Sequence, residues 1–276
     1  AIIALGYTMV YGIAKMLNFA HGDVIMVGAY VILTCITRGG MSPVLAVILS
    51  VVVCTVLGVV IEKVAYSPLR KASSNLAVLI TAIGVSYLLQ NLALYVTGGL
   101  AKVYPQIPGL SANVSIGGAS TKWVTIITPF LTIFLVVVLT QLINHTKIGM
   151  AMRAVSRDFE TSQLMGIKIN NVISMTFIIG TFLAAVGSLL YFTNYQSVVP
   201  TSGAMPGLKA FVAAVFGGIG SIPGAVIGAF IIGICENIIK GLGWTTFSDA
   251  FTFALLIVVL CVKPTGLFGE KVTDKV

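Results

Sequence analysis

Few side chains in this sequence could carry out catalysis, and their spacing matches none of the common reactive constellations. The 276 residues contain no G-x-S-x-G nucleophile elbow, no H-E-x-x-H metal motif and no G-x-x-x-x-G-K-S/T phosphate loop, and they include only two histidines. The four cysteines lie singly inside apolar runs, where small buried side chains explain them better than a disulfide framework or a metal site. The sequence therefore predicts neither an enzyme nor a subunit that hydrolyses ATP itself.

Two groups of polar residues interrupt or end apolar runs. One is the block Asn18-Phe19-Ala20-His21-Gly22-Asp23, and the other is Glu236 with Asn237. If these runs cross a bilayer, such residues are costly and usually face the bundle interior or water. The candidates for lining a translocation path, or for positioning helices around one, are Asn18, His21, Gly22, Asp23 and Glu236. A structural role is the alternative, since Asp23 at a helix start would favour the positive dipole end and Glu236 would lie near an outer interface.

The densest charge lies between residues 145 and 170, in a polar stretch between two apolar runs. The segment Arg153–Met165 predicts a short helix in which Val155, Phe159 and Leu164 recur among charges, and Gly166 is a plausible stop signal. A solvated face is one interpretation, and a docking element for another subunit is the second. The candidate residues of such a docking loop are Arg153, Arg157, Asp158 and Glu160, with Gly166 at its turn.

The amino-acid composition indicates that most of the chain lies in a membrane rather than in water. Hydrophobic residues make up 58% of the chain and charged residues only 9%, whereas a soluble domain carries about 25% charged residues. A protein surface that faces lipid tails needs few charged residues, so a membrane location explains the low charge content. The net charge of +8 does not indicate nucleic acid, because the Lys and Arg residues are scattered at the ends of apolar runs rather than gathered in a basic patch. The lipid bilayer is the expected partner.

A spanning helix needs about 20 apolar residues, and the chain offers a series of such stretches. The candidate spans are 1–16, 20–37, 43–62, 75–97, 123–144, 171–193, 222–239 and 248–263. A ninth stretch, Pro206–Phe216, is too short to cross unaided and predicts a half-helix or re-entrant piece packed against protein. The predicted fold is an all-α, polytopic transmembrane helical bundle of about eight spans plus one short broken or re-entrant helix, in a single domain 1–276 whose first span is expected to be truncated.

Alternating these spans gives one consistent orientation if Pro206–Phe216 also carries the chain across. The loops at 62–75 and 145–170 and the C-terminal tail then share a side, which holds more Lys and Arg than the other and is predicted to be cytoplasmic. If the short stretch does not cross, the last two spans reverse. Small residues recur at four-residue spacing at Gly220, Gly224 and Gly228, which lines one helix face with little bulk and predicts close helix packing; Gly217 is a further packing candidate.

Several segments resemble a known family. Glu160 and Gly166 keep the spacing of the coupling loop in permeases of ATP-binding-cassette (ABC) importers, although Thr161 and Ser162 replace its two alanines. The segments Gly6-Tyr7-Thr8-Met9-Val10-Tyr11-Gly12, Asn18–Asp23, Ala210–Gly228 and Lys263–Gly269 look like the first of the two permease types in branched-chain amino acid importers. The resemblance covers nearly the whole chain.

The resemblance implies a pore-forming subunit of an importer in a bacterial-type inner membrane, without catalysis of its own. It implies a second permease subunit, two ATPase subunits that carry ATP and Mg²⁺ and bind the cytoplasmic loops, and an extracytoplasmic substrate-binding protein; no cofactor is expected in this chain. Its relatives carry leucine, isoleucine and valine, other amino acids, or urea and short amides. The alternative is a self-sufficient secondary transporter or channel for a small polar solute, which would rest on the regions around Pro206 and Asn18–Asp23.

Overall fold

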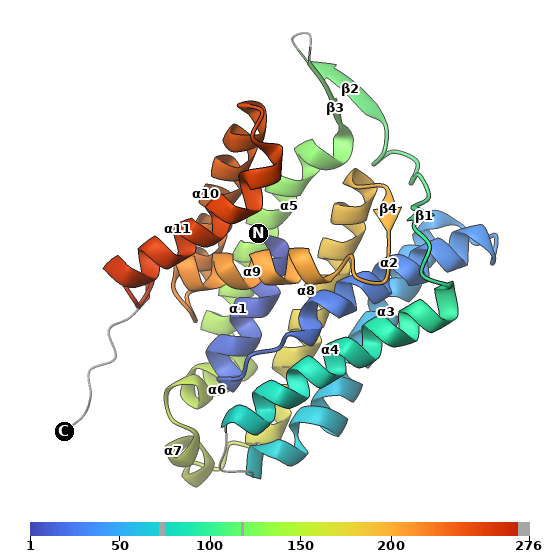
Figure 1. The fold of residues 1–276 in the computed structure, drawn as a ribbon. Helices are drawn as coiled ribbons and strands as arrows, with labels where there is room; N and C mark the ends of the chain where they lie inside the picture. Colours follow the sequence, from blue (N-terminus) through green and yellow to red (C-terminus); the bar gives the residue numbers. More distant parts are fainter. Residues whose placement is uncertain (72–74, 117–118, 270–276) are drawn as a thin grey trace.

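The computed structural model describes residues 1–71, 75–116 and 119–269, and its regular structure is almost entirely helical (Figure 1). The main helices are α1 (Ile2–Ala14), α2 (Ala20–Thr37), α3 (Pro43–Ile61), α4 (Asn75–Thr97), α5 (Trp123–His145), α8 (Ile169–Asn194), α9 (Ala204–Gly217), α10 (Ile222–Gly241) and α11 (Ser248–Val262). A π-helical turn, Glu62–Tyr66, extends α3, and short 3-10 turns lie at Pro68–Lys71 and Thr245–Phe247. The polar stretch after α5 forms α6 (Lys147–Arg157) and α7 (Phe159–Leu164).

The little strand structure lies in the connections between helices. Strand β1 (Lys102–Val103) pairs with β4 (Ser197–Val198), and β2 (Asn113–Ile116) pairs with β3 (Ala119–Lys122); both pairs are antiparallel. The β2–β3 hairpin projects from the end of the bundle opposite α6 and α7 (Figure 1). We call the end where α6 and α7 lie the α6 end.

The helical bundle confirms the predicted fold class, with one difference in the number of spans. Seven helices in the described part of the chain are long and apolar enough to cross a membrane. The predicted first span, 1–16, forms only the 13-residue helix α1, because Lys15 adopts a left-handed conformation with φ of 54° and ends the helix. Helix α9, at 14 residues, is likewise too short to cross alone. The chain is a multi-pass membrane protein.

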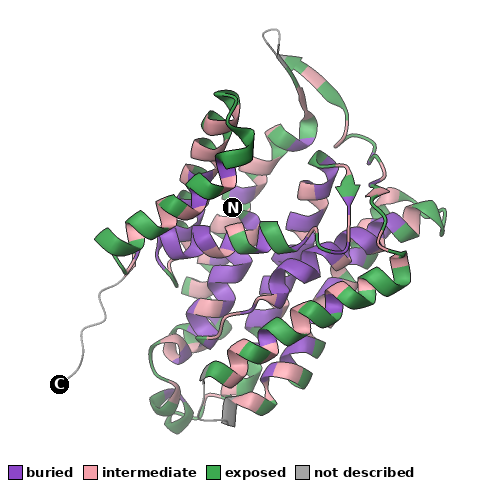
Figure 2. Ribbon diagram, viewed as in Figure 1, coloured by how far each residue is buried: buried purple, intermediate pink, exposed green. Residues whose placement is uncertain are grey.

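Burial divides the helices into a core and an outer layer (Figure 2). Most residues of α1, α2 and α8 are buried, whereas α4, α5 and α11 bury only a few of theirs. The exposed side chains of these outer helices are large and apolar, among them Leu88, Phe130 and Ile257. Contiguous apolar surface of this kind does not face water in a soluble monomer, so the outer layer fits a lipid environment.

Glycines let the core helices approach closely. A Cβ atom added to Gly22 of α2 would overlap the carbonyl oxygen of Gly203, which directly precedes α9, and would lie 3.2 Å from the Cα of Gly207. A Cβ on Gly6 of α1 would lie 2.8 Å from the carbonyl oxygen of Gly180 in α8. Small residues at such crossings allow backbone-to-backbone packing, which holds helices together where no hydrophobic effect drives their association.

Contacts at the end of α9 show at which end of the bundle α10 begins and α11 ends. After α11, the backbone N–H groups of Leu267 and Phe268 donate to the carbonyls of Phe216 and Gly217 at the end of α9, each over 3.0 Å. A Cβ on Gly12 near the end of α1 would lie 2.9 Å from the Cα of Gly220. The end of α9, the start of α10 and the segment after α11 therefore meet near the α6 end, as in the arrangement where the short stretch carries the chain across. The tail beyond residue 269 lies outside the described residues.

Candidate functional site

The polar block occupies the connection between α1 and α2 and the first turn of α2, inside the bundle. Asn18 is buried, and its Oδ1 accepts a hydrogen bond of 3.1 Å from the hydroxyl of Tyr66, in the π-helical turn after α3. In the same turn, the carboxylate of Glu62 accepts a hydrogen bond of 2.7 Å from Ser174 of α8. These bonds connect the α1–α2 junction, the end of α3 and α8 into one polar layer.

Asp23 extends this layer to α4. Its carboxylate is buried and accepts a hydrogen bond of 2.9 Å from Nε2 of Gln90. It lies in the first turn of α2, where the helix dipole favours a negative charge. No side-chain hydrogen bond caps the start of α2, so Asp23 joins two helices rather than capping its own.

His21 fills the space between α1 and α2. Its side chain is fully buried, and its ring meets that of Tyr7 edge-on, with the centroids 5.9 Å apart. A Cβ on Gly6 would lie 2.9 Å from Cε1 of the ring, so the histidine lies directly against the α1 backbone. Neighbouring Gly22 contacts the start of α9, as described above. The structure thus brings the four candidates of the block together at the centre of the bundle.

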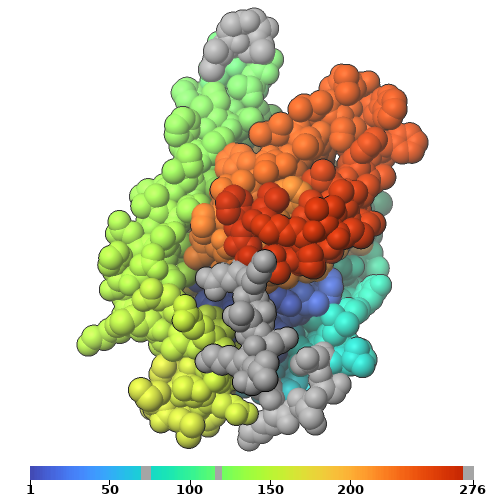
Figure 3. Space-filling view, turned by 90° about the vertical axis from the view of Figure 1, so that its left-hand side faces the viewer, coloured from blue at the N-terminus to red at the C-terminus, as the bar shows by residue number. Residues whose placement is uncertain are grey.

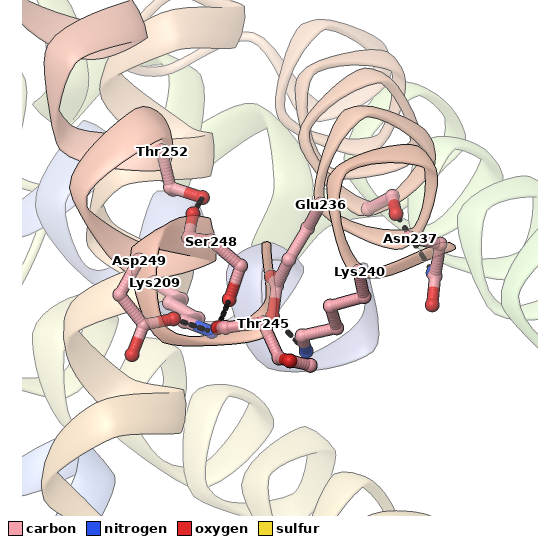
Figure 4. Close-up of polar contacts among 9 residues, drawn as sticks. Lys209, Glu236, Asn237, Lys240, Thr245, Ser248, Asp249 and Thr252 are labelled. Atoms are coloured by element: carbon pink, nitrogen blue, oxygen red, sulfur yellow. Dashed lines mark hydrogen bonds and ion pairs between the residues drawn. The ribbon is translucent and has the colours of Figure 1, made fainter. Parts of the chain in front are cut away.

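Glu236 lies apart from this block, in a cluster of ion pairs that joins the last three main helices (Figure 4). Lys209 of α9 lies 2.7 Å from Glu236 of α10 and 2.7 Å from Asp249 of α11, and Lys240 also pairs with Glu236. The Glu236 side chain is only 13% exposed. Two ammonium groups therefore compensate a largely buried carboxylate, and the removal of one would leave an incompletely paired charge.

The partners of Glu236 were not identified from the sequence. Lys240 lies four residues after Glu236, which is a helical spacing visible in the sequence. Lys209 lies 27 positions before Glu236, and Asp249, the second partner of Lys209, belongs to the next helix, so no helical spacing connects these residues. For Lys209 a different signal was available: it is a single charge inside the short apolar stretch Pro206–Phe216, and an isolated charge at membrane depth needs a partner.

The predicted helix Arg153–Met165 is wrong in one respect, because the segment forms two helices. Helix α6 ends at Arg157, and Asp158 is extended, with φ of −155° and ψ of 117°. The Asp158 carboxylate accepts hydrogen bonds from the N–H groups of Glu160 (2.9 Å) and Thr161 (3.2 Å). Aspartate is a preferred N-cap residue, so Asp158 starts α7 instead of continuing α6.

Gly166 ends α7 in the left-handed region, with φ of 83°. Its N–H donates to the carbonyl of Gln163 (3.0 Å), and the N–H of Ile167 donates to that of Ser162 (3.1 Å). Helices commonly end on a glycine in this conformation because it has no Cβ. The reversal returns the chain from the tip of α7 to the start of α8.

The side chains of this segment divide into an inner and an outer set. Met152 and Val155 are buried in one cluster with Met9 of α1 and Val172 of α8. The outer set is exposed and comprises Arg153, Arg157, Asp158, Glu160 and Leu164. Leu164, the last of the apolar residues that recur among the charges, lies at the end of α7, 87% exposed, beside the exposed Met165.

The glycine-rich block connects α9 to α10. A Cβ on Gly228 would lie 2.6 Å from the carbonyl oxygen of Ala213, and one on Gly217 would overlap the carbonyl of Gly224. Gly220 does not share this helix face: α10 begins at Ile222, with Ser221 as its N-cap, and Gly220 lies in the preceding turn with φ of 89°. Among the described residues, no group of three or more His, Cys, Asp or Glu side chains could hold a metal ion.

Comparisons with known proteins agree over the length of the chain. The family model for the permease component of branched-chain amino acid transport systems matches residues 1–260. The chain is 41% identical to the high-affinity branched-chain amino acid transport system permease protein BraD of Pseudomonas aeruginosa, over 100% of this chain and 93% of that protein. It is 40% identical to LivH of Escherichia coli K12, with the same coverage, and 28% identical to the ribose import permease RbsC of Haemophilus influenzae, over 98% of this chain and 83% of that protein. No solved structure matches the chain.

Proposed function

The chain belongs to the branched-chain amino acid transport permease family, and from that premise we propose that it forms part of the translocation path for leucine, isoleucine and valine. It is a permease component of an ABC transport system, as the sequence resemblance indicated. The substrate class is carried over from the relatives named above. A self-sufficient secondary transporter or channel is not supported, because the family consists of components of larger transport systems.

We propose that the complete importer lies in a bacterial-type inner membrane and contains a second permease subunit, two ATPase subunits and an extracytoplasmic substrate-binding protein. ATP and Mg²⁺ would bind to the ATPases. The multi-pass bundle and its relatives in bacteria support this assignment. The α6 end is then cytoplasmic, in agreement with the positive charge predicted for that side.

The observation that carries this proposal is the two-sided construction of α6 and α7. The outer side presents Arg153, Arg157 and Glu160, and the exposed pair Leu164 and Met165 lies at the end of α7. The inner side packs its buried residues against α1 and α8 of the core. A partner that binds the outer side and changes position can therefore move the core helices, because packed side chains transmit displacement.

The proposed mechanism is alternating access. ATP-bound and ATP-free ATPases would hold α6 and α7 in different positions, and their differential affinity for the two states of the bundle would drive the change. This chain supplies the contact surface and the moving helices, and no chemical step takes place on its residues.

ATP-driven uptake by the reconstituted importer tests the proposal. Proteoliposomes that hold both permeases and both ATPases, with the binding protein outside, should accumulate L-leucine in an ATP-dependent manner and should not accumulate urea. Omission of the ATPases should abolish uptake. Accumulation of leucine by this chain alone, or accumulation of urea instead of leucine, would contradict the proposed function.

A further inference from the structure

A cavity of about 800 Å³ opens at the α6 end between α1, the end of α5, α6 and the turn from α9 to α10. This volume lies in the range of ligand pockets. On this face, α5 to α7 lie on one side in green and yellow, α10 and α11 lie on the other in orange and red, and part of the blue N-terminal segment is visible between them (Figure 3). The cavity therefore reaches from the surface towards α1, the most buried helix.

An unsatisfied hydroxyl lies on the wall of this cavity. Six threonines of the described chain are buried, and five of them donate to the carbonyl four residues earlier in their own helix; these are Thr132, Thr176, Thr181, Thr193 and Thr252. Thr8 of α1 is the exception: it is 1% exposed, its Oγ1 has no hydrogen-bond partner in the described structure, and the residue lines the cavity. A buried hydroxyl without a partner costs about 1–3 kcal/mol, so its position points to a ligand.

Two helix ends of opposite polarity meet at the same cavity. Helix α10 begins beside it, with Ser221 accepting a hydrogen bond of 3.2 Å from the N–H of Gly224. Helix α1 ends beside it, and Gly12 lies against the backbone of Gly220. The start of a helix attracts a negative group, and the final carbonyls of a helix attract a positive one. A zwitterion satisfies both ends, whereas a simple anion satisfies only the first.

The rim of the cavity is basic. Lys15, Arg153 and Arg157 line it, and no acidic side chain does so among the described residues. Lys15 is also the one non-glycine residue in the described chain with a positive φ, at 54°. A glycine would adopt this conformation at no steric cost, so the backbone conformation does not explain why the residue is a lysine. A role for its positive charge at the rim of the cavity does.

The remaining wall of the cavity is apolar. Met9 and Ile13 of α1, Ile143 of α5 and Ile219 and Ile222 beside the start of α10 contribute to it. Aliphatic side chains of this kind favour a ligand with a compact hydrophobic part. The cavity thus combines a group that hydrogen-bonds, two helix ends, a cationic rim and an aliphatic wall.

We propose that this cavity is an inner binding site for an aliphatic α-amino acid on its way to the cytoplasm. The carboxylate of the ligand accepts a hydrogen bond from Thr8 and lies near the start of α10 and the basic rim. Its ammonium group lies near the carbonyls that end α1, and its side chain contacts the aliphatic wall. This inference rests on the proposed function, because it assigns a site to the proposed substrate. An anionic lipid headgroup would also suit the basic rim, and the lipid composition in the experiment below separates that ligand from an amino acid.

Ligand binding by the whole transporter tests this site. The complex of two permeases and two ATPases is placed in nanodiscs without ATP or binding protein, and calorimetry measures the binding of L-leucine, leucinol and 4-methylpentanoate. Leucinol lacks the carboxylate, and 4-methylpentanoate lacks the ammonium group; we expect each to bind at least about tenfold more weakly than leucine, the effect of losing a hydrogen-bonded charged group.

Two matched variants locate the site. Thr8→Val removes the unpaired hydroxyl and should weaken leucine binding about tenfold. Thr176→Val changes an equally buried threonine whose hydroxyl is bonded within its own helix, and it should leave leucine binding unchanged. Any of three results would overturn the inference. They are that the wild-type complex binds no leucine, that the two variants bind leucine equally well, or that leucine binds only when phosphatidylglycerol is omitted from the nanodiscs. ATP-driven leucine uptake, measured separately, decides the proposed function, so the two can fail independently.

Discussion

The polar block at the start of α2 and the charged segment α6–α7 contain similar residue types in opposite arrangements. In the block, the side-chain hydrogen bonds reach another helical element: Asn18 accepts from Tyr66, and Asp23 accepts from Gln90. In the charged segment, Asp158 caps the start of its own helix, and Gly166 closes the same helix. Arg153 reaches a neighbouring helix, at Asn144 of α5. The difference separates two tasks. Polar groups bonded between helices fix the bundle, whereas polar groups that cap and close a short helix shape an outer surface.

The largest effect should come from the crossing at the polar block. Replacement of Gly22 by Leu would place side-chain atoms where the backbone of Gly203 lies. Overpacking typically costs about 1–3 kcal/mol and occasionally more, and the upper end applies here because backbone atoms would have to move. We expect the variant to be lost from the membrane or to elute as aggregate in detergent. The control is Gly84→Leu in α4, where an added Cβ has no atom within 4 Å. A monodisperse Gly22→Leu protein with wild-type Tm would show that the crossing does not fix the bundle.

The next largest effect should separate folding from coupling at the charged segment. Gly166→Val forces a β-branched residue to φ of 83° and should deform the end of α7 without touching the core. We expect a normal yield and Tm, with ATP-driven leucine uptake reduced more than about tenfold because a partner would no longer fit the surface.

A matched glycine tests that interpretation. Gly109 has φ of 87° and open space around it, but it lies in the loop that connects α4 to α5 at the opposite end of the bundle. Gly109→Val should therefore introduce similar local strain and leave transport close to wild type. Equal loss of uptake in both variants would mean that backbone strain itself, and not the position on α7, reduces transport.

The ion-pair cluster of α9, α10 and α11 should behave like the polar block, with a smaller effect. Lys209→Met leaves Glu236 with one of its two ammonium partners and Asp249 without its lysine. We expect a loss of stability of about 1–3 kcal/mol, below the value for fully buried pairs because Lys209 is 25% exposed. Thermal unfolding in detergent measures the loss.

A double variant that also removes the charge of Glu236 is the matched comparison for Lys209→Met. The double variant Lys209→Met with Glu236→Gln removes the carboxylate that was left underpaired, and it should recover part of the lost Tm. A double variant whose loss equals the sum of the two single losses would indicate that the pair contributes no coupling, and that α9 is held by packing alone.

Local and non-local interactions also explain what the sequence could predict. The helices could be placed within a few residues because apolar length is a local property, and the exposed charged segment was identified for the same reason. The hydrogen bonds Asp23–Gln90 and Ser174–Glu62 join residues 67 and 112 positions apart, and no spacing rule connects them. The ion pair between Lys209 and Asp249 could not be predicted for the same reason.

Two errors arose where local signals compete. The helix break at Asp158 was not predicted, because Asp158 lies among other charged residues and fits the interior of an exposed helix. Aspartate is also a preferred N-cap residue, and here it caps the helix that begins at Phe159. Gly220 was assigned to a helix face because its spacing to Gly224 fits, while Pro223 and Ser221 mark a later helix start. In both places the pattern of side chains is periodic, but the capping residue decides where the helix begins.

The smallest effect should come from that cap, and it gives the finest test of the division between local and inter-helix bonding. Asp158→Ala removes two bonds to the N–H groups at the start of α7, a loss of about 1 kcal/mol. Because these two bonds lie within one short exposed helix, their loss alone should not change the global Tm, while α7 frays and leucine uptake falls a few-fold. Asp158→Asn keeps a capping oxygen and should retain most of the uptake, which separates the cap from the charge. A marked fall in Tm with Asp158→Ala would mean that α7 supports the bundle itself, and the distinction between the two regions would not hold.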